Sequence, residues 1–156
     1  MKIKMIAAFS IATAAALPLA AIANACGGGG DFPSDYEFVS PSGNIVCAMY
    51  ADNTGANCQV REHTWAVPVS THGPYGRACH FSFGGLEFFV SKSKPGNLGC
   101  YEGGSKFDTP GLETLDYGQT HSRGAITCDS EQSGVTCTDT ATGHFFRVSR
   151  GSYELG

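Results

Sequence analysis

The chain has 156 residues, and its ten basic and fourteen acidic side chains give a formal net charge of −4 at pH 7. This length is enough for one domain and not for two. An acidic surface repels phosphate backbones and anionic lipid head groups, so the composition argues against nucleic-acid binding and against a polybasic membrane patch.

The first segment, residues 1–25, has the composition of a secretory signal peptide. Two lysines precede an apolar, alanine-rich run that closes at Ala23-Asn24-Ala25. A charged start, an apolar centre and an A-x-A end make up an export signal, and the run is too short and too weakly flanked for a retained transmembrane helix. We therefore expect an exported protein, in which eight of the ten basic residues remain against fourteen acidic ones.

One of the seven cysteines, Cys26, stands directly after this leader. Lipidation of Cys26 after cleavage at Ala25 makes residues 26–35 a flexible tether to the membrane. Cleavage by an ordinary signal peptidase instead leaves a free thiol in an oxidising compartment. We favour the lipid, because an unpaired thiol is a liability there. Membrane contact is then expected only through this N-terminal anchor.

Residues 36–156 are expected to form a single β domain. Glycine and proline separate short apolar and β-branched runs, and no run after the leader keeps a helical period. The first strands are expected at 36–40, 44–50 and 57–61, with a turn at 52–55. The expected fold class is all-β, with antiparallel hairpins in a small sandwich or open barrel, three disulfides and little helix.

Two hairpins repeat one cysteine pattern. Each reads G-x-I-x-C, a turn, and then G-x-x-C. Period-two alternation places each isoleucine on the same face as the following cysteine, and the short turn suits a cross-strand bridge. Six cysteines allow fifteen pairings, so the assignment is an inference from local geometry. The expected bridges are Cys47–Cys58, Cys128–Cys137 and, by elimination, Cys79–Cys100.

Between these hairpins we expect a third hairpin and a long irregular segment. With Gly84-Gly85 as a two-residue turn, residues 79–83 face residues 86–90 and give one apolar side. Residues 92–120 are rich in glycine, serine and proline, which predicts a crossover tied down by Cys100. Residues 144–150, with Tyr153 and Leu155 beyond them, are expected to form one or two terminal strands that pack on the second cysteine hairpin.

The sequence offers little catalytic chemistry. Its five histidines lie far apart, and it contains no H-E-x-x-H, C-x-x-C or G-x-S-x-G motif. A Ser-His-Asp set can assemble only in space, with Ser149, His144 or His121, and Asp139 as the candidates. We expect no catalytic residue, no metal and no cofactor. A hydrolase with a site near the C-terminal strands is a third hypothesis.

Several motifs spread over residues 38–155 form a recognisable set. They are S-P-S-G-N-I-x-C from Ser40, Trp65 before Pro68, Tyr117-Gly118, C-x-S with G-V-T-C from Cys128, and T-G-H-x-F-x-V-S-R-x-x-Y-x-L from Thr142. Together they resemble a family of small exported proteins of unknown function, mainly from high-GC Gram-positive bacteria. The resemblance implies an all-β, disulfide-bearing protein that is secreted or lipid-anchored, and it implies no activity.

The C-terminal stretch also supplies the candidate binding residues. An arginine pair there can receive a carboxylate or phosphate of an envelope glycan or peptide. The structural alternative is that Arg150 pairs with a local acid such as Glu154 and that His144 caps a turn. The candidates are His144, Arg147, Ser149, Arg150 and Tyr153.

The leading functional hypothesis is a non-catalytic binding or interaction module of the cell envelope. It is anchored through Cys26 on the outer side of the cytoplasmic membrane or, alternatively, secreted, and its partner is an unknown envelope component or protein. A second hypothesis is a secreted inhibitor of a foreign hydrolase, which predicts a protein partner and a protruding loop between Lys92 and Thr109.

Overall fold

The structure is a computed structural model that describes residues 35–73, 77–79, 85–101 and 105–156. The expected signal peptide, Cys26 and nearly all of the expected tether lie outside these residues. All the described residues belong to one compact unit, Asp31–Gly156. Within it the fold is all-β, as the sequence predicts, and no α-helix occurs in the described part of the chain.

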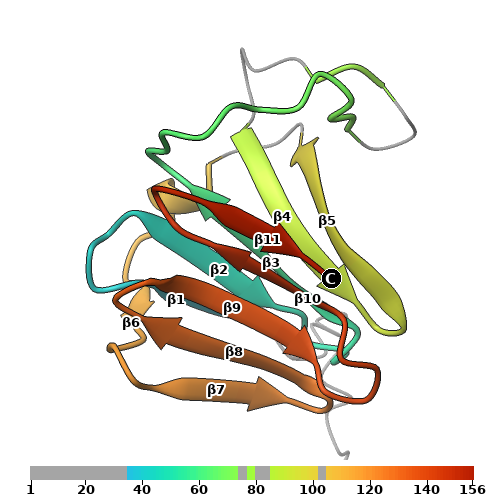
Figure 1. The fold of residues 1–156 in the computed structure, drawn as a ribbon. Coiled ribbons are helices and arrows are strands. Elements are labelled where there is room, and N and C mark those ends of the chain that lie inside the picture. Colours follow the sequence, from blue (N-terminus) through green and yellow to red (C-terminus); the bar gives the residue numbers. More distant parts are fainter. Residues whose placement is uncertain (1–34, 74–76, 80–84, 102–104) are drawn as a thin grey trace, which may run out of the picture. The chain divides into compact units, whose positions relative to one another are not determined.

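Two sheets make up the fold (Figure 1). The first has the order β5-β4-β3-β2-β1-β6, antiparallel throughout except for the parallel β1–β6 pair. Its strands are β1 (Tyr36–Val39), β2 (Ile45–Met49), β3 (Gly55–Val60), β4 (Gly85–Ser91), β5 (Lys94–Tyr101) and β6 (Glu113–Thr114). The second is antiparallel, in the order β11-β10-β9-β8-β7. Its strands are β7 (Thr120–Arg123), β8 (Ile126–Glu131), β9 (Gly134–Asp139), β10 (Phe145–Val148) and β11 (Tyr153–Leu155).

The inward faces of the two sheets share one apolar core, as in a β-sandwich. Alternate residues point inward along each strand, so Phe88 in the first sheet and Phe146 in the second are fully buried with ring centroids 6.0 Å apart. Trp65 precedes β4 and packs edge-on against Phe88 at 5.6 Å and Tyr153 at 4.9 Å. Its indole N–H donates to the carbonyl of Ser149 at 3.1 Å, which fastens the segment before β4 to the second sheet.

The three expected disulfides are confirmed. Two of them join residues that face each other in register, Cys47 with Cys58 on β2–β3 and Cys128 with Cys137 on β8–β9. Their Cα atoms are 4.0 and 4.1 Å apart, the close spacing of opposed residues in an antiparallel pair. The third bridge, Cys79–Cys100, ties the segment before β4 to β5.

The expected hairpin around Gly84-Gly85 is wrong. Residues 80–84 lie outside the described part of the chain, but both edges of β4 are already occupied. Phe88 faces Cys58 of β3 on one side and Leu98 of β5 on the other, so residues 79–83 are not its partner. The hairpin that β4 does form turns at Lys92-Ser93 and continues into β5.

The irregular crossover expected over residues 92–120 is also wrong in its first half. Residues 94–101 form β5, an eight-residue strand, and residues 106–108 form the 3₁₀-helix η2 (Lys106–Asp108). Pro95 is compatible with β5 because this strand lies at the edge of its sheet, where a missing N–H breaks no ladder. A protruding loop between Lys92 and Thr109, which the inhibitor hypothesis predicted, is therefore not formed by residues 92–101.

Polar and backbone contacts fix the β4–β5 hairpin against the second sheet. Asp139 is fully buried, and its carboxylate accepts hydrogen bonds from the Ser93 N–H at 2.8 Å and the Thr142 hydroxyl at 2.9 Å. At Gly96 the two backbones approach so closely that a Cβ atom there would lie 1.9 Å from the carbonyl oxygen of Phe145. Only glycine leaves room for this approach.

Candidate functional site

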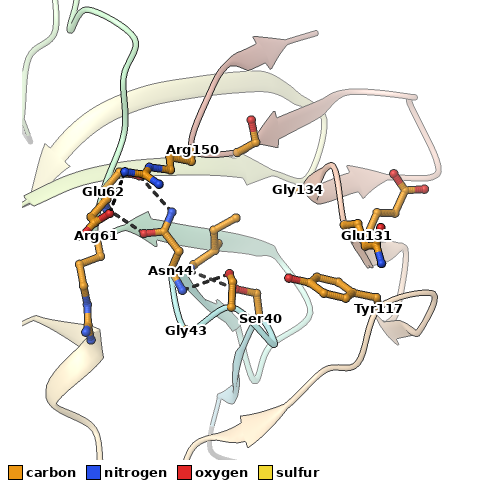
Figure 2. A pocket seen from close by; sticks show the side chains of 13 residues that line it. Ser40, Gly43, Asn44, Arg61, Glu62, Tyr117, Glu131, Gly134 and Arg150 are labelled. Carbon is orange, nitrogen blue, oxygen red and sulfur yellow. Dashed lines mark hydrogen bonds and ion pairs between the residues drawn. The ribbon is translucent and has the colours of Figure 1, made fainter.

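A pocket of about 450 Å³ opens where strand ends and turns of both sheets meet (Figure 2). The first sheet contributes residues from segments 40–45 and 61–62, and the second contributes residues from 131–134 and 149–150. Tyr117, which precedes β7, completes the lining. The pocket is therefore built from turns that a rigid sandwich holds in place, a common arrangement for binding sites.

The β1–β2 turn is fixed by its own hydrogen bonds. The backbone N–H of Gly43 donates to the carbonyl of Ser40 at 2.8 Å, and Gly43 has a φ of +70°, which glycine adopts without strain. The Ser40 hydroxyl accepts from the N–H of Ile45 and lies 3.1 Å from the hydroxyl of Ser42. The turn is therefore preformed: Ser40 is 3% exposed and its hydroxyl holds the turn, and the neighbouring Ser42 is exposed at the pocket.

Asn44 joins this turn to the end of β3. Its amide nitrogen donates to the carbonyl of Glu62 at 3.0 Å, and its amide oxygen accepts from the Glu62 N–H at 2.9 Å. Both ends of the amide are thus satisfied by one residue, and the Arg61 N–H donates to the Asn44 carbonyl. Asn44 acts as a positioning residue that fixes the backbone beneath Glu62.

The charges around the pocket are balanced. Arg150 and Glu62 form an ion pair at 3.3 Å, with side chains 68% and 65% exposed. Arg61 lines the pocket with its stem but extends away from the Arg150 side in Figure 2, and its guanidinium lies 4.6 Å above the ring of Phe107. Glu131, the other acidic residue of the lining, lies 3.7 Å from the guanidinium of Arg147, so each glutamate of the lining is paired with an arginine. Such a site favours a neutral or zwitterionic ligand over a phosphate.

Tyr117 supplies the aromatic surface of the pocket. It is 40% exposed, whereas Leu115 two residues earlier is buried and its N–H donates to the Val39 carbonyl. Gly118 has a φ of +85°, and its N–H donates to the Ser130 carbonyl at 2.7 Å. The chain is therefore held on both sides of Tyr117, whose hydroxyl points toward the β1–β2 turn in Figure 2.

A buried hydroxyl belongs to Ser130, whose carbonyl accepts the Gly118 N–H next to this tyrosine. Ser130 is on the inward face of β8, fully buried, and its hydroxyl has no hydrogen-bond partner among the described residues. A buried polar group without a partner costs free energy, so it indicates an unfilled hydrogen-bonding position. The next residue, Glu131, lines the pocket.

The structure brings two of the five candidate binding residues to this pocket, Ser149 and Arg150. The others are not in its lining. Arg147 lies 3.7 Å from the carboxylate of Glu131 and donates to the hydroxyl of Ser133. Tyr153 packs into the core, and His144 follows the turn that Asp139 closes, where its carbonyl accepts the Asp139 N–H. The acid that meets Arg150 is Glu62 rather than the expected Glu154.

Sequence reasoning missed Asn44, Glu62 and Tyr117. The Ser-Pro-Ser-Gly-Asn run is a recognisable turn signal. Nothing in the sequence places that turn beside Tyr117 and Arg150, because the three segments meet only after both sheets have packed.

The candidate catalytic residues do not form a triad. The Ser149 hydroxyl donates to the carbonyl of Ser152 at 3.0 Å, and His121 stacks on Tyr36 at 3.6 Å. The pKa of Asp139 is lowered, chiefly by the hydrogen bond from the Ser93 N–H, so this carboxylate serves as a structural tie. In the part of the chain that the structure describes, no hydrogen bond joins Ser149 to a histidine.

Three sulfur atoms come within 4.8 Å of one another, those of Cys47, Cys58 and Cys137. This grouping does not fit a metal centre, because a metal requires thiolates and all three sulfurs are held in disulfides.

Comparison of the chain with protein-family models, with curated proteins and with solved structures found no match. Within the described ranges there is no helix with the length and apolar character needed to cross a membrane.

Proposed function

We propose that this protein is a non-catalytic binding module of the cell envelope whose site is the pocket between the β1–β2 turn, Tyr117 and Arg150. The observation that carries the proposal is the combination of an exposed aromatic ring with a preformed polar frame in a pocket of about 450 Å³. This volume lies in the range of small-molecule sites.

The chemistry of the lining favours a neutral, hydroxyl-rich ligand such as a segment of an envelope glycan. Serine hydroxyls and the exposed Glu62–Arg150 pair offer donors and acceptors that match sugar hydroxyls. The ring of Tyr117 gives an amphipathic surface on which the apolar face of a sugar can lie. The balanced charge of the lining supports this choice over an anionic ligand.

Isothermal titration calorimetry with short neutral or N-acetylated oligosaccharides tests the proposal. We expect saturable binding that Tyr117→Ala weakens at least tenfold. Leu155→Ala is the matched control, because Leu155 is similarly exposed, at 38%, and does not line the pocket. Absence of binding to every neutral sugar, or equal losses in the two variants, contradicts the proposal.

The envelope location is part of the same proposal and rests on the leader, on Cys26 and on the resemblance to small exported proteins. The disulfides support it, because such bonds persist in oxidising compartments. Intact mass spectrometry of the protein from its host tests this point. We expect a chain that begins at Cys26, carries acyl groups and gains six protons when its three disulfides are reduced. An unacylated protein in the medium contradicts the anchor.

A second candidate function, inhibition of a foreign hydrolase, is favoured by one residue. Val69 is fully exposed, at 103%, in a turn closed by the hydrogen bond from the Thr71 N–H to the Pro68 carbonyl. Trp65 anchors the chain before the turn, and after it the disulfide-bonded Sγ atom of Cys79 lies 3.4 Å from the Thr71 carbonyl oxygen. A rigid turn with an apolar tip suits the small apolar pocket of an endopeptidase.

Inhibition of endopeptidases that prefer small aliphatic residues tests this candidate. We expect Val69→Asp to abolish inhibition and Ser70→Ala to preserve it. Full activity of these enzymes in the presence of the wild-type protein contradicts the inhibitor function.

A further inference from the structure

Two disulfides face each other across the core. The Sγ atom of Cys58 on β3 lies 4.0 Å from the Sγ atom of Cys137 on β9, which is contact distance for two sulfur atoms. Cys47 completes the group, with its sulfur within 4.8 Å of both. Cys128 is the bonded partner of Cys137 and is not in the group. All four cysteines are fully buried.

Proximity of this kind is what thiol–disulfide exchange requires, since a thiolate must reach one sulfur of a neighbouring disulfide. We propose that these four cysteines form an internal exchange site. On two-electron reduction by an external dithiol, it replaces the two bridges within the sheets by one bridge between the sheets, Cys58–Cys137.

The reaction is balanced in two steps. First, the dithiol reduces Cys47–Cys58 to two thiols and is itself oxidised to a disulfide. Next, the Cys58 thiol loses its proton and the thiolate attacks Sγ of Cys137. The new S–S bond forms as the Cys128–Cys137 bond breaks, and Cys128 leaves as a thiolate that takes up the proton. The product holds Cys58–Cys137 and two free thiols, Cys47 and Cys128.

The same product arises if the other bridge is reduced first. The Cys137 thiolate then attacks Cys58, and Cys47 leaves. Both routes converge because the 4.0 Å contact joins one sulfur from each bridge. The geometry therefore predicts which two cysteines end as thiols, whichever disulfide opens first.

The exchange changes what the covalent links hold together. The native bridges span 11 and 9 residues and each stays within its own sheet. Cys58 and Cys137 are 79 residues apart and belong to different sheets. A bridge that closes a longer segment restricts the unfolded chain more. The partly reduced protein thus gains a disulfide between the two sheets that frame the pocket, which the native bridges do not provide.

Partial reduction of the full chain tests the proposal. The wild-type protein is treated with limiting dithiothreitol in a low concentration of denaturant, which opens the buried bridges, and thiols are then trapped by alkylation and mapped by mass spectrometry. Among species that have lost one of the two core bridges, we expect alkylated Cys47 and Cys128 together with a Cys58–Cys137 linked peptide. Alkylation only of the native pairs, Cys47 with Cys58 or Cys128 with Cys137, overturns it.

Two double variants provide an independent test. Cys47→Ser/Cys128→Ser leaves Cys58 and Cys137, and we expect air oxidation to join them. The control, Cys47→Ser/Cys137→Ser, leaves Cys58 and Cys128, which we expect to remain thiols. Free thiols in the first variant, or equal cross-linking in both, overturns the proposal, and the partial reduction decides the question if either variant does not fold.

Discussion

The close packing of β5 against β10 depends on the absence of a side chain at Gly96. A Cβ atom at this position would lie 1.9 Å from the carbonyl oxygen of Phe145 and 2.6 Å from its carbonyl carbon. These are backbone atoms, so no side chain can rotate to relieve the clash. The N–H of Gly96 also donates to the carbonyl of Gly156 at 2.9 Å, and separating the strands breaks that bond.

The magnitude follows from these two effects. Overpacking a tight site costs about 1–3 kcal/mol, and loss of the hydrogen bond costs about 1 kcal/mol. Gly96→Ala should therefore lower the free energy of unfolding by about 2–4 kcal/mol. For a domain of this size the melting temperature should fall by roughly 8–16 °C.

Urea denaturation followed by the fluorescence of Trp65, the one tryptophan of the chain, measures this change. Trp65 reports on both sheets because it packs against Phe88 and Tyr153. Gly85→Ala is the control, since a Cβ atom there meets nothing within 4 Å. Its stability should stay within about 0.5 kcal/mol of the wild type or rise slightly. A Gly96→Ala protein as stable as the Gly85→Ala protein would show that the two backbones can separate at this point without cost.

Three further predictions concern charge. The pKa of Asp139 is lowered in the folded protein, so the ionised carboxylate stabilises the fold. This contribution is complete above the pKa of the unfolded chain and is lost as pH falls through the pKa of the folded protein. The urea midpoints of the wild type and of Asp139→Asn should therefore converge in acid. Burial raises the pKa of Tyr50 from 10.0 to about 12, so its stabilising effect is complete below pH 10 and disappears as pH rises towards 12. Ultraviolet titration should show a late-titrating component that Tyr50→Phe removes, and an unchanged titration curve contradicts the assignment. Arg150→Ala should alter the free energy of unfolding by less than about 1 kcal/mol, because the ion pair with Glu62 is exposed. The same variant should lose its retention on envelope material, and unchanged retention dismisses the role of Arg150 in binding.

The cysteine hairpins could be predicted from the sequence because their information is local. In each, the alternation of side chains and a short turn place Cys47 opposite Cys58, or Cys128 opposite Cys137. The terminal strands β10 and β11 could be predicted for a similar reason, since apolar and polar residues alternate along the segment that follows the second hairpin.

The partners of β4 could not be predicted in the same way. The alternation of apolar residues shows that the face of β4 that carries Phe88 and Val90 is buried. It does not show which strands lie beside β4. The strand β5 was missed because Pro95, Gly96 and Gly99 give it the composition of a loop. Its edge position allows the proline, the close approach to Phe145 requires Gly96, and a tight contact with the His72 carbonyl favours Gly99. These constraints come from tertiary contacts, so they cannot be recognised in a short stretch of sequence.

The residues of the candidate site also differ in whether the sequence could predict them. Ser149 and Arg150 stood out because polar side chains are concentrated near the C-terminus. Tyr117 did not, since its exposure depends on the buried Leu115 before it and on the Gly118 hydrogen bond after it.

Nuclear magnetic resonance can locate a ligand at the Tyr117 pocket residue by residue. A ¹⁵N-labelled protein is titrated with short neutral oligosaccharides, and the amide shifts are mapped on the structure. We expect shifts confined to the β1–β2 turn, to residues around Tyr117, to 131–134 and to 149–150. Shifts that gather around Val69, or no shifts at saturating ligand, would contradict a ligand site at this pocket.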